Sequence, residues 1–242
     1  MDETNEAPLS SQLKDALQKT CTRMGVFLEE ERAAALCVYI DELARWNRAY
    51  NLVGRRVGTQ GMIDLCVDAI TPLCIKGLFG EEKEVLDIGC GAGMPGIPLY
   101  ILAGPFPLTL VEPQRKKVTF LRHIRRKMGL EGISIYPGRV EAMARDDDHL
   151  NAYETAMARA VTDPLRLARM AEPLLCEGGQ LVLFAGEKDA GEIRRYGASL
   201  EAKGLRVQAT RSTKRLTSRD CYLVQLVKTR PHGMREARSP GR

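Results

Sequence analysis

The sequence predicts an α/β protein in which a doubly wound parallel sheet follows an N-terminal helical extension. In the first third of the 242 residues, apolar side chains such as Leu36, Ile40 and Leu43 recur at the helical period. After Glu84, short β-branched segments alternate with amphipathic ones, which is typical of parallel strands joined by helices. We expect three parts: a helical extension at residues 1–80, the sheet domain at 81–228 and a basic, disordered tail at 229–242.

Three helical segments are predicted in the extension. Leu13 and Leu17 indicate the first, and the run from Leu36 to Tyr50 indicates the second. The third is the apolar segment 62–78, which follows two glycines.

Six strands and four helices are predicted in the sheet domain. The strands are residues 85–88, 108–111, 133–136, 155–158, 181–185 and 222–227, and the helices are 95–102, 115–128, 164–175 and 191–203. Asp163 is a predicted N-cap with Pro164 at the first helical position, and Gly178-Gly179 predicts a stop. Ligands of such sheets bind at the carboxyl ends of the strands.

Composition favours a soluble globular protein, with 44% hydrophobic and 28% charged residues. The uncharged segment 88–111 is long enough to span a bilayer, but its glycines and prolines favour a strand, a turn and a short helix. The acidic, polar start predicts no signal peptide, so we expect a cytoplasmic protein that binds no membrane. Seven cysteines without a CxxC motif and three scattered histidines predict reduced thiols and no metal site.

The net charge of +5 is unevenly distributed along the chain. Residues 115–127 carry +7 and residues 200–242 carry +8, whereas the rest of the chain is acidic. This arrangement predicts a positive face for a polyanion, and a solvated helix face with a solvated tail is the alternative.

A glycine-rich loop is the sharpest motif. The segment DIGCGAGMPG, residues 87–96, lies between a predicted strand and a predicted helix. Glycines there let the backbone approach a ligand closely, because a Cβ atom would occupy the ligand's space. Residues 91–96 also satisfy the dinucleotide pattern GxGxxG, so both a dinucleotide and a bare tight turn are alternatives.

Three observations favour S-adenosylmethionine over NAD. The Asp87 carboxylate lies where it can face an ammonium group but would repel a pyrophosphate. Pro95 lacks an N–H donor near the helix start, where a phosphate would require one. Glu112 ends the second strand and Glu141 follows the third, so both are candidate contacts to the ribose and the adenine end. An NAD-linked oxidoreductase stays the alternative.

At these residues the sequence resembles the GidB family, also called RsmG, the small-subunit (16S) ribosomal RNA guanine-N7 methyltransferases. The resemblance includes WNRAYNL at 46–52, similar to the family's WNxxYNL, and DIGCGAGMPGIP at 87–98. It continues through RKKVTFL at 115–121, RVE at 139–141 and MARA at 157–160. It implies a Rossmann-like class I methyltransferase that uses S-adenosylmethionine.

The resemblance also implies a set of cofactor-binding residues. Glu112 stands where the family's second-strand carboxylate would meet the ribose. The chain departs from the family at Leu65, where a histidine is usual, and at Ala185, where a lysine is usual, although Lys188 follows three residues later. The full predicted cofactor-binding set is Asp87, Gly89, Gly91, Met94, Glu112, Val140, Glu141 and Arg159.

The implied chemistry requires no general base, because guanine N7 carries a lone pair and no proton. Arg159-Ala-Val-Thr162 lacks the Asn/Asp-Pro-Pro-aromatic motif that aligns an exocyclic amine, and we predict no catalytic residue. The expected partner is 16S rRNA or the small subunit. A noncatalytic RNA-binding assembly factor on the same fold is the alternative. The candidate RNA contacts are Lys116, Lys117, Arg122 and Arg126.

Overall fold

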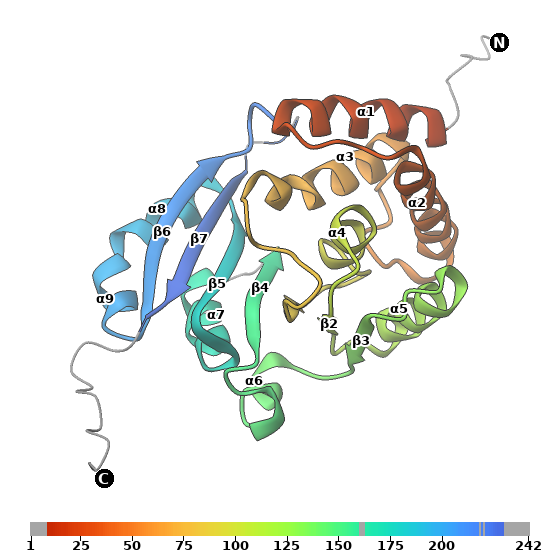
Figure 1. Cartoon of the computed structure of the whole chain (residues 1–242). Coiled ribbons are helices and arrows are strands. Elements are labelled where there is room, and N and C mark those ends of the chain that lie inside the picture. The colour runs from red at the N-terminus through yellow and green to blue at the C-terminus, as the bar shows by residue number, and fades with distance from the viewer. Residues whose placement is uncertain (1–8, 160–162, 218, 220, 230–242) are drawn as a thin grey trace, which may run out of the picture.

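The computed structural model describes residues 9–159, 163–217, 219 and 221–229 as one sheet with helices on both faces (Figure 1). The strands are β1 (Val85–Ile88), β2 (Leu108–Val111), β3 (Ile133–Tyr136), β4 (Tyr153–Arg159), β5 (Leu175–Ala185), β6 (Leu205–Ser212) and β7 (Tyr222–Lys228). The helices are α1 (Leu9–Met24), α2 (Glu30–Tyr50), α3 (Thr59–Ala69), α4 (Gly96–Ala103), α5 (Arg115–Met128), α6 (Val140–Met143), α7 (Pro164–Ala171), α8 (Glu187–Arg195) and α9 (Gly197–Glu201). Short 3-10 helices lie at Thr71–Cys74, Asp147–His149 and Glu172–Leu174. The predicted α/β class with helices at its N-terminal side is confirmed.

The sheet has the strand order β3-β2-β1-β4-β5-β7-β6. Strands β1 to β5 are parallel, whereas β7 runs antiparallel to both β5 and β6. The expectation of a wholly parallel sheet is therefore wrong at this edge. Its cause is β6, a strand that sequence analysis missed. The β6–β7 connection is too short for a crossover helix, so the two strands must pair as a hairpin.

Most predicted boundaries agree with the structure. The three strands β1 to β3 and helix α5 have the predicted bounds, and Asp163 caps α7 by accepting the Arg166 N–H at 2.8 Å. The stop predicted at Gly178-Gly179 is wrong, because β5 runs through both glycines. A Cβ at Gly179 would lie 2.9 Å from the Tyr153 carbonyl oxygen, so glycine permits the close approach of β5 to the irregular start of β4.

Three predicted helices also differ from those in the structure. The segment predicted at 62–78 holds α3, which begins at Thr59 and ends at Ala69, and the 3-10 helix Thr71–Cys74. Helix α7 ends at Ala171 and passes into the 3-10 helix Glu172–Leu174. The helix predicted at 191–203 is two helices, α8 and α9. Acidic residues Glu187 and Asp189 in the first turn of α8 favour its earlier start through the helix dipole.

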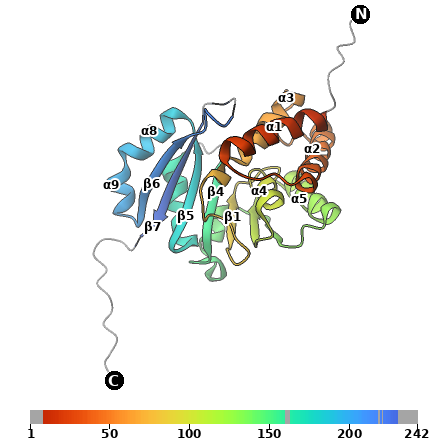
Figure 2. The same ribbon diagram turned by 45° about the horizontal axis from the view of Figure 1, so that its top comes forward.

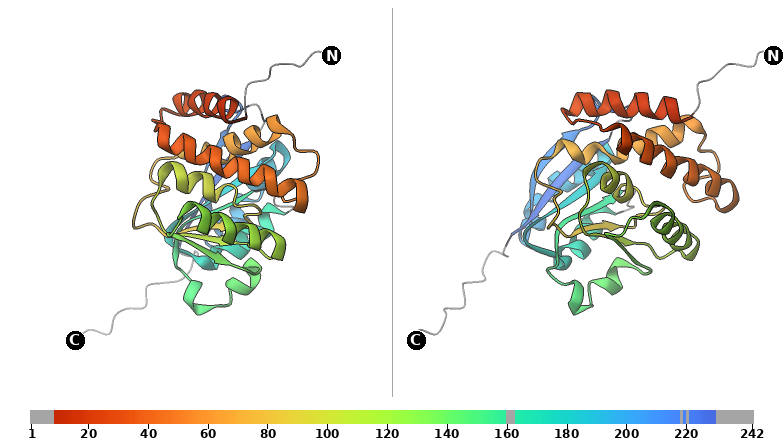
Figure 3. Two further views of the ribbon diagram at one scale, coloured as in Figure 1. Left: turned by 90° about the vertical axis from the view of Figure 1, so that its right-hand side faces the viewer. Right: turned by 45° about the vertical axis from the view of Figure 1, so that its right-hand side comes forward.

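Two apolar layers cover the sheet. Helices α1 to α5 pack on one face and share a core with Val85, Leu108 and Met157, while α6 to α9 cover Leu86, Ala156 and their neighbours on the other. Figure 2 shows α8 and α9 on one side of the sheet and α1, α4 and α5 on the other. In Figure 3, α1 and α2 are stacked over α4 and α5. The predicted extension at 1–80 thus belongs, as far as it is described, to the same core as the sheet.

Helix α3 lies at the carboxyl end of β4, where the arrowhead of β4 points toward it (Figure 1). All seven cysteines are free, and four of them are buried. Within the described ranges, no helix is both long enough and apolar enough to cross a membrane. The predicted tail at 229–242 lies outside the described residues apart from Thr229.

Candidate functional site

The glycines of the loop after β1 have different roles. Gly89, Gly91 and Gly93 have φ values of 67°, 62° and 95°, a left-handed region that favours glycine. A Cβ at Gly93 would lie 2.4 Å from Ile97 Cδ1, so this glycine is required for packing. A Cβ at Gly89 would meet nothing within 4 Å, so this position borders open space at the carboxyl end of β1. Gly89 is therefore the position at which the backbone is accessible to a ligand.

The Asp87 carboxylate lies beneath this loop and is fully buried. Its Oδ2 accepts the Gly96 N–H at 2.8 Å, and its Oδ1 has no hydrogen-bond partner among the described residues. Burial raises the pKa of Asp87 to about 7, although the Gly96 N–H and the Arg159 charge oppose that rise. An unsatisfied carboxylate oxygen in such a place is stabilised by a hydrogen-bond donor, and most strongly by a cationic one.

Glu112 at the end of β2 supports the loop from the other side. Its Oε2 accepts the Gly91 N–H at 2.9 Å and its Oε1 accepts the Gln114 N–H at 2.7 Å. The carboxylate is nearly inaccessible, with 2% of the residue exposed. Glu112 therefore fixes the position of Gly91, and each oxygen keeps one lone pair for a further donor. Sequence analysis assigned Glu112 to a ligand only and missed this support.

Arg159 at the end of β4 joins the loop to helix α3. Its Nη2 donates to Met94 Sδ at 3.8 Å, and its Nη1 donates to the Leu65 carbonyl oxygen at 3.2 Å. Burial lowers the pKa of the guanidinium, and the carboxylates of Asp68 and Asp87 oppose that change. Because Leu65 is contacted through its backbone, replacement of the family's usual histidine leaves this contact in place.

Tyr39 of α2 is a site residue that sequence analysis missed. It is fully buried, and its hydroxyl donates to the Ala92 carbonyl oxygen of the loop at 2.9 Å. Sequence reasoning made no prediction for Tyr39, because a tyrosine on the apolar face of a helix gives no signal beyond packing. Cys90 in the same loop is buried, and burial raises the pKa of its thiol, which therefore stays neutral and unsuited to nucleophilic attack.

Val140 and Glu141 lie in α6, which follows β3, and no hydrogen bond or ion pair joins them to Asp87 or Arg159 in the described structure. Val140 is buried with the second core layer, and Glu141 pairs with Arg166 at 3.6 Å. Lys188, the predicted substitute for the family's lysine, is exposed on α8. The predicted segment 160–162 lies outside the described residues. No cluster of metal-ligating side chains occurs among the described residues.

The cations of α5 have three different environments. Lys116 Nζ donates to the Tyr50 carbonyl oxygen at 3.0 Å, and Lys127 Nζ contacts Glu42 at 2.5 Å, so both hold α5 against α2. Lys117 lies beside the loop, with its Nζ 3.8 Å from the position of a Cβ at Gly91. A further group of exposed cations lines a hollow of about 550 Å³: Arg122, Arg125 and Arg126.

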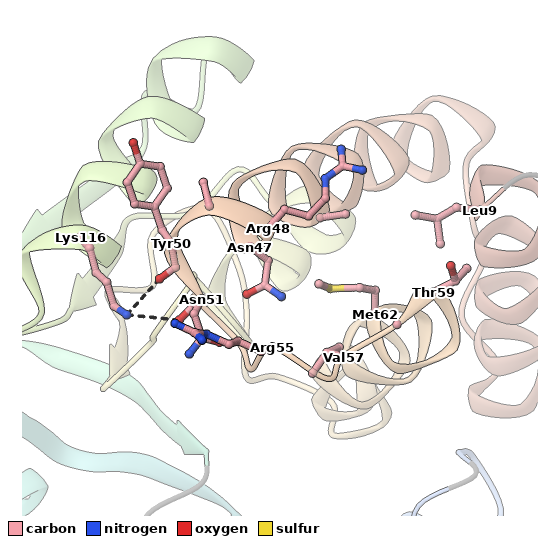
Figure 4. Close-up of a pocket in the computed structure, with 13 residues that line it drawn as sticks. Leu9, Asn47, Arg48, Tyr50, Asn51, Arg55, Val57, Thr59, Met62 and Lys116 are labelled. Atoms are coloured by element: carbon pink, nitrogen blue, oxygen red, sulfur yellow. Dashed lines mark hydrogen bonds between the residues drawn. The ribbon is translucent and has the colours of Figure 1, made fainter.

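A second hollow, of about 640 Å³, lies between α2, α3 and the start of α5. Figure 4 shows Arg48 from α2, Arg55 from the following loop and Lys116 from α5 around it, with Met62 of α3 pointing into it. Arg48 and Arg55 are exposed and form no ion pair in the described part of the chain.

The sheet order with an antiparallel β7, the glycine loop after β1 and the carboxylate at the end of β2 define a class I S-adenosylmethionine-dependent methyltransferase fold. Dinucleotide-binding folds instead have the order 3-2-1-4-5-6. A solved S-adenosylmethionine-dependent methyltransferase from Aquifex aeolicus has the same fold, with a TM-score of 0.54 and 17% identity over 67% of this chain and 92% of that one.

Sequence comparison identifies the family. The sequence model of the GidB family, described as rRNA small subunit methyltransferase G, matches residues 32–221, and the chain belongs to that family. It is 32% identical to the ribosomal RNA small subunit methyltransferase G of Rubrobacter xylanophilus, over 84% of this chain and 77% of the relative. The protein of the same name from Syntrophotalea carbinolica is 30% identical, over 79% of this chain and 87% of the relative.

Proposed function

We propose that this protein transfers a methyl group from S-adenosylmethionine to N7 of a guanine in small-subunit (16S) ribosomal RNA, in the cytoplasm. The observation that carries the proposal is the family match across residues 32–221, which covers most of α2, all of α3 and strands β1 to β6. The unpaired Oδ1 of buried Asp87 supports the choice of a cationic cofactor.

The cofactor-binding residues are assigned from their places at the carboxyl ends of β1 to β4. Asp87 Oδ1 accepts from the cofactor's ammonium group, and Gly89 and Gly91 allow close backbone approach. Glu112 accepts from ribose hydroxyls with the lone pairs that the loop leaves free. Met94, Val140, Glu141 and Arg159 complete the binding site.

The chain's contribution to the reaction is alignment and exclusion of water. S-adenosylmethionine, when bound, supplies a methyl group activated by a sulfonium sulfur. The guanine N7 lone pair forms the new carbon–nitrogen bond while the carbon–sulfur electron pair leaves with sulfur, so no side chain needs to remove a proton. Alignment of the two groups is worth up to about 7–11 kcal/mol in the best cases. The contact of half-buried Arg159 with buried Met94 supports a role for this pair in the alignment.

The test is a methyl-transfer assay. Purified protein is incubated with methyl-labelled cofactor and either small subunits or stripped rRNA from a deletion strain, and labelled guanines are located by N7-selective chain cleavage. We expect label at one guanine N7 in at least one substrate. Absence of N7 label from both substrates overturns the proposal. Calorimetric binding of NAD without binding of S-adenosylmethionine would overturn the cofactor assignment.

A further inference from the structure

We propose that the hollow between α2, α3 and α5 binds a nucleotide of the RNA strand that flanks the methylated guanine. This inference rests on the proposed function and adds a second contact site to it. The hollow is separate from the glycine loop, and none of the predicted cofactor-binding residues lines it.

The charge of the hollow favours a phosphate. Arg48, Arg55 and Lys116 line it, and no acidic side chain does so among the described residues. The two arginines are exposed and lack ion-pair partners in the same part of the chain, so their guanidinium groups are available to phosphate oxygens.

The apolar part of the lining favours a base. Leu9, Val57 and Met62 contribute apolar side chains to the hollow, and Thr59 adds a hydroxyl. Its volume of about 640 Å³ falls within the range of about 300–1,000 Å³ typical of small-ligand sites. A lining that combines apolar side chains with cations matches a nucleotide, which presents a flat base beside a phosphate.

The wall of the hollow is held rigid by hydrogen bonds. The Asn47 side chain donates to the Gly54 carbonyl oxygen and accepts the Val53 N–H, both at 3.0 Å. Lys116 Nζ donates to the carbonyl oxygens of Tyr50 and Asn51, the residues at which α2 ends. A preformed wall reduces the ordering cost of binding. The WNRAYNL segment thus builds this wall.

The hollow adjoins the proposed methyl-transfer site through two helices. On α5, Lys116 lines the hollow and the next residue, Lys117, lies beside Gly91. On α3, Met62 lines the hollow and Leu65, one turn later, contacts Arg159. A flanking nucleotide in the hollow therefore restrains the strand close to the reacting guanine. The exposed cations Arg122, Arg125 and Arg126 lie further along α5 from the hollow. This extended positive charge favours a nucleic acid strand over a protein partner.

The test is the double variant Arg48→Ala with Arg55→Ala, compared with Arg194→Ala with Lys203→Ala, which removes the same charge from exposed residues beyond the other face of the sheet. Methylation kinetics, binding to stripped rRNA as a function of salt, and cofactor binding are measured. We expect KM for RNA to rise at least tenfold and the slope of log K against log salt to fall by roughly 1–2, with cofactor affinity unchanged. The control is expected to match the wild type.

Three results would overturn this inference. One is an unchanged KM and salt slope in the double variant. Another is weaker methylation of assembled subunits with unchanged binding to stripped rRNA, which would indicate a protein contact instead. The third is an equal loss of RNA binding in the Arg194→Ala with Lys203→Ala control, which would show that any loss of positive charge has this effect. If the wild type transfers no methyl group, the proposed function fails, but the RNA-binding comparison still tests the hollow.

Discussion

The two oxygens of the buried Asp87 carboxylate differ in their partners. Oδ2 fixes the first residue of α4 through the Gly96 N–H, and Oδ1 is left without a partner in the described structure. The DIGCGAG motif predicts that an acid stands here, but it does not reveal the division between the two oxygens. Tyr39 was unpredictable for a similar reason, because a tyrosine on an apolar helix face indicates packing and its hydroxyl partner depends on tertiary structure.

If Asp87 binds the cofactor's ammonium group as proposed, its pKa should make cofactor binding dependent on pH. Burial raises this pKa to about 7, so at lower pH a cationic ligand must first displace the carboxyl proton. We expect S-adenosylmethionine to bind roughly tenfold more weakly at pH 6.0 than at pH 7.5, by calorimetry. Asp87→Asn, which retains an acceptor for Gly96, is expected to bind weakly and equally at both values. Equal wild-type affinities at the two pH values would contradict the assignment.

The raised pKa of Asp87 should also make folding stability depend on pH. Stability should rise as pH falls, whereas cofactor binding should weaken. Because the folded pKa lies above the unfolded value of 3.8, the contribution of Asp87 is fully present below pH 3.8 and is lost as pH rises through 7. Without cofactor, the stability of the wild type relative to Asp87→Asn should therefore increase as pH falls from 8 to 6. Urea unfolding at both pH values measures this difference.

At the scale of elements, buried segments were predicted better than exposed ones. Strands β1 and β2 are buried at every residue, and their bounds follow from short apolar runs between turns. Strand β6 is an edge strand, and it carries exposed Arg206 and Arg211, so its alternation is weak and it was missed. Charge likewise predicted a positive face on α5. It did not predict that the Glu42 carboxylate binds Arg45, His123 and Lys127.

Glu42 joins α2 to α5 and should stabilise the fold at neutral pH. Burial would raise its pKa, but hydrogen bonds from Lys127, His123 and Arg45 outweigh burial and lower it to about 2. Its contribution is therefore present above about pH 4.5 and is lost as pH falls through 2. We expect Glu42→Gln to cost about 1–3 kcal/mol at pH 7, a difference that shrinks at pH 3.

Urea unfolding at the two pH values measures the effect of Glu42. Asp41→Asn is the matched control, because Asp41 is the exposed neighbour on the same helix. A Glu42→Gln cost that is the same at pH 3 and pH 7 would mean that lost packing, not lost charge, is responsible.

Helix α5 should bind RNA through its free cations. We expect Arg122→Glu with Arg126→Glu to weaken rRNA binding and to reduce the salt slope, while cofactor affinity stays unchanged. Filter binding between about 50 and 200 mM salt measures the slope. Arg169→Glu with Arg194→Glu, on helices of the opposite face, is the charge-matched control. An unaltered slope would indicate that the α5 face is only solvated.

At the scale of the whole molecule, the helices before β1 complete the site as well as the core. Tyr39 reaches the glycine loop, Leu65 receives Arg159 and Glu42 holds α5, so each of α2 and α3 touches the catalytic sheet domain directly. A boundary near residue 80 could be predicted from the change of hydrophobic period. The sequence could not show that the segments on the two sides of this boundary share one core, because a hydrophobic period does not show which surface a helix packs against.

The shared core predicts that the described chain unfolds as one cooperative unit. Leu36 of α2 is fully buried in the layer that also covers β1 and β2. We expect Leu36→Ala to cost about 2–5 kcal/mol and to lower hydrogen-exchange protection equally in α2 and in the amides of β1. Val38→Ala, on the same helix but 44% exposed, should cost no more than about 0.5 kcal/mol. If Leu36→Ala lowered protection in α2 alone, the first 80 residues would be an independently folding domain.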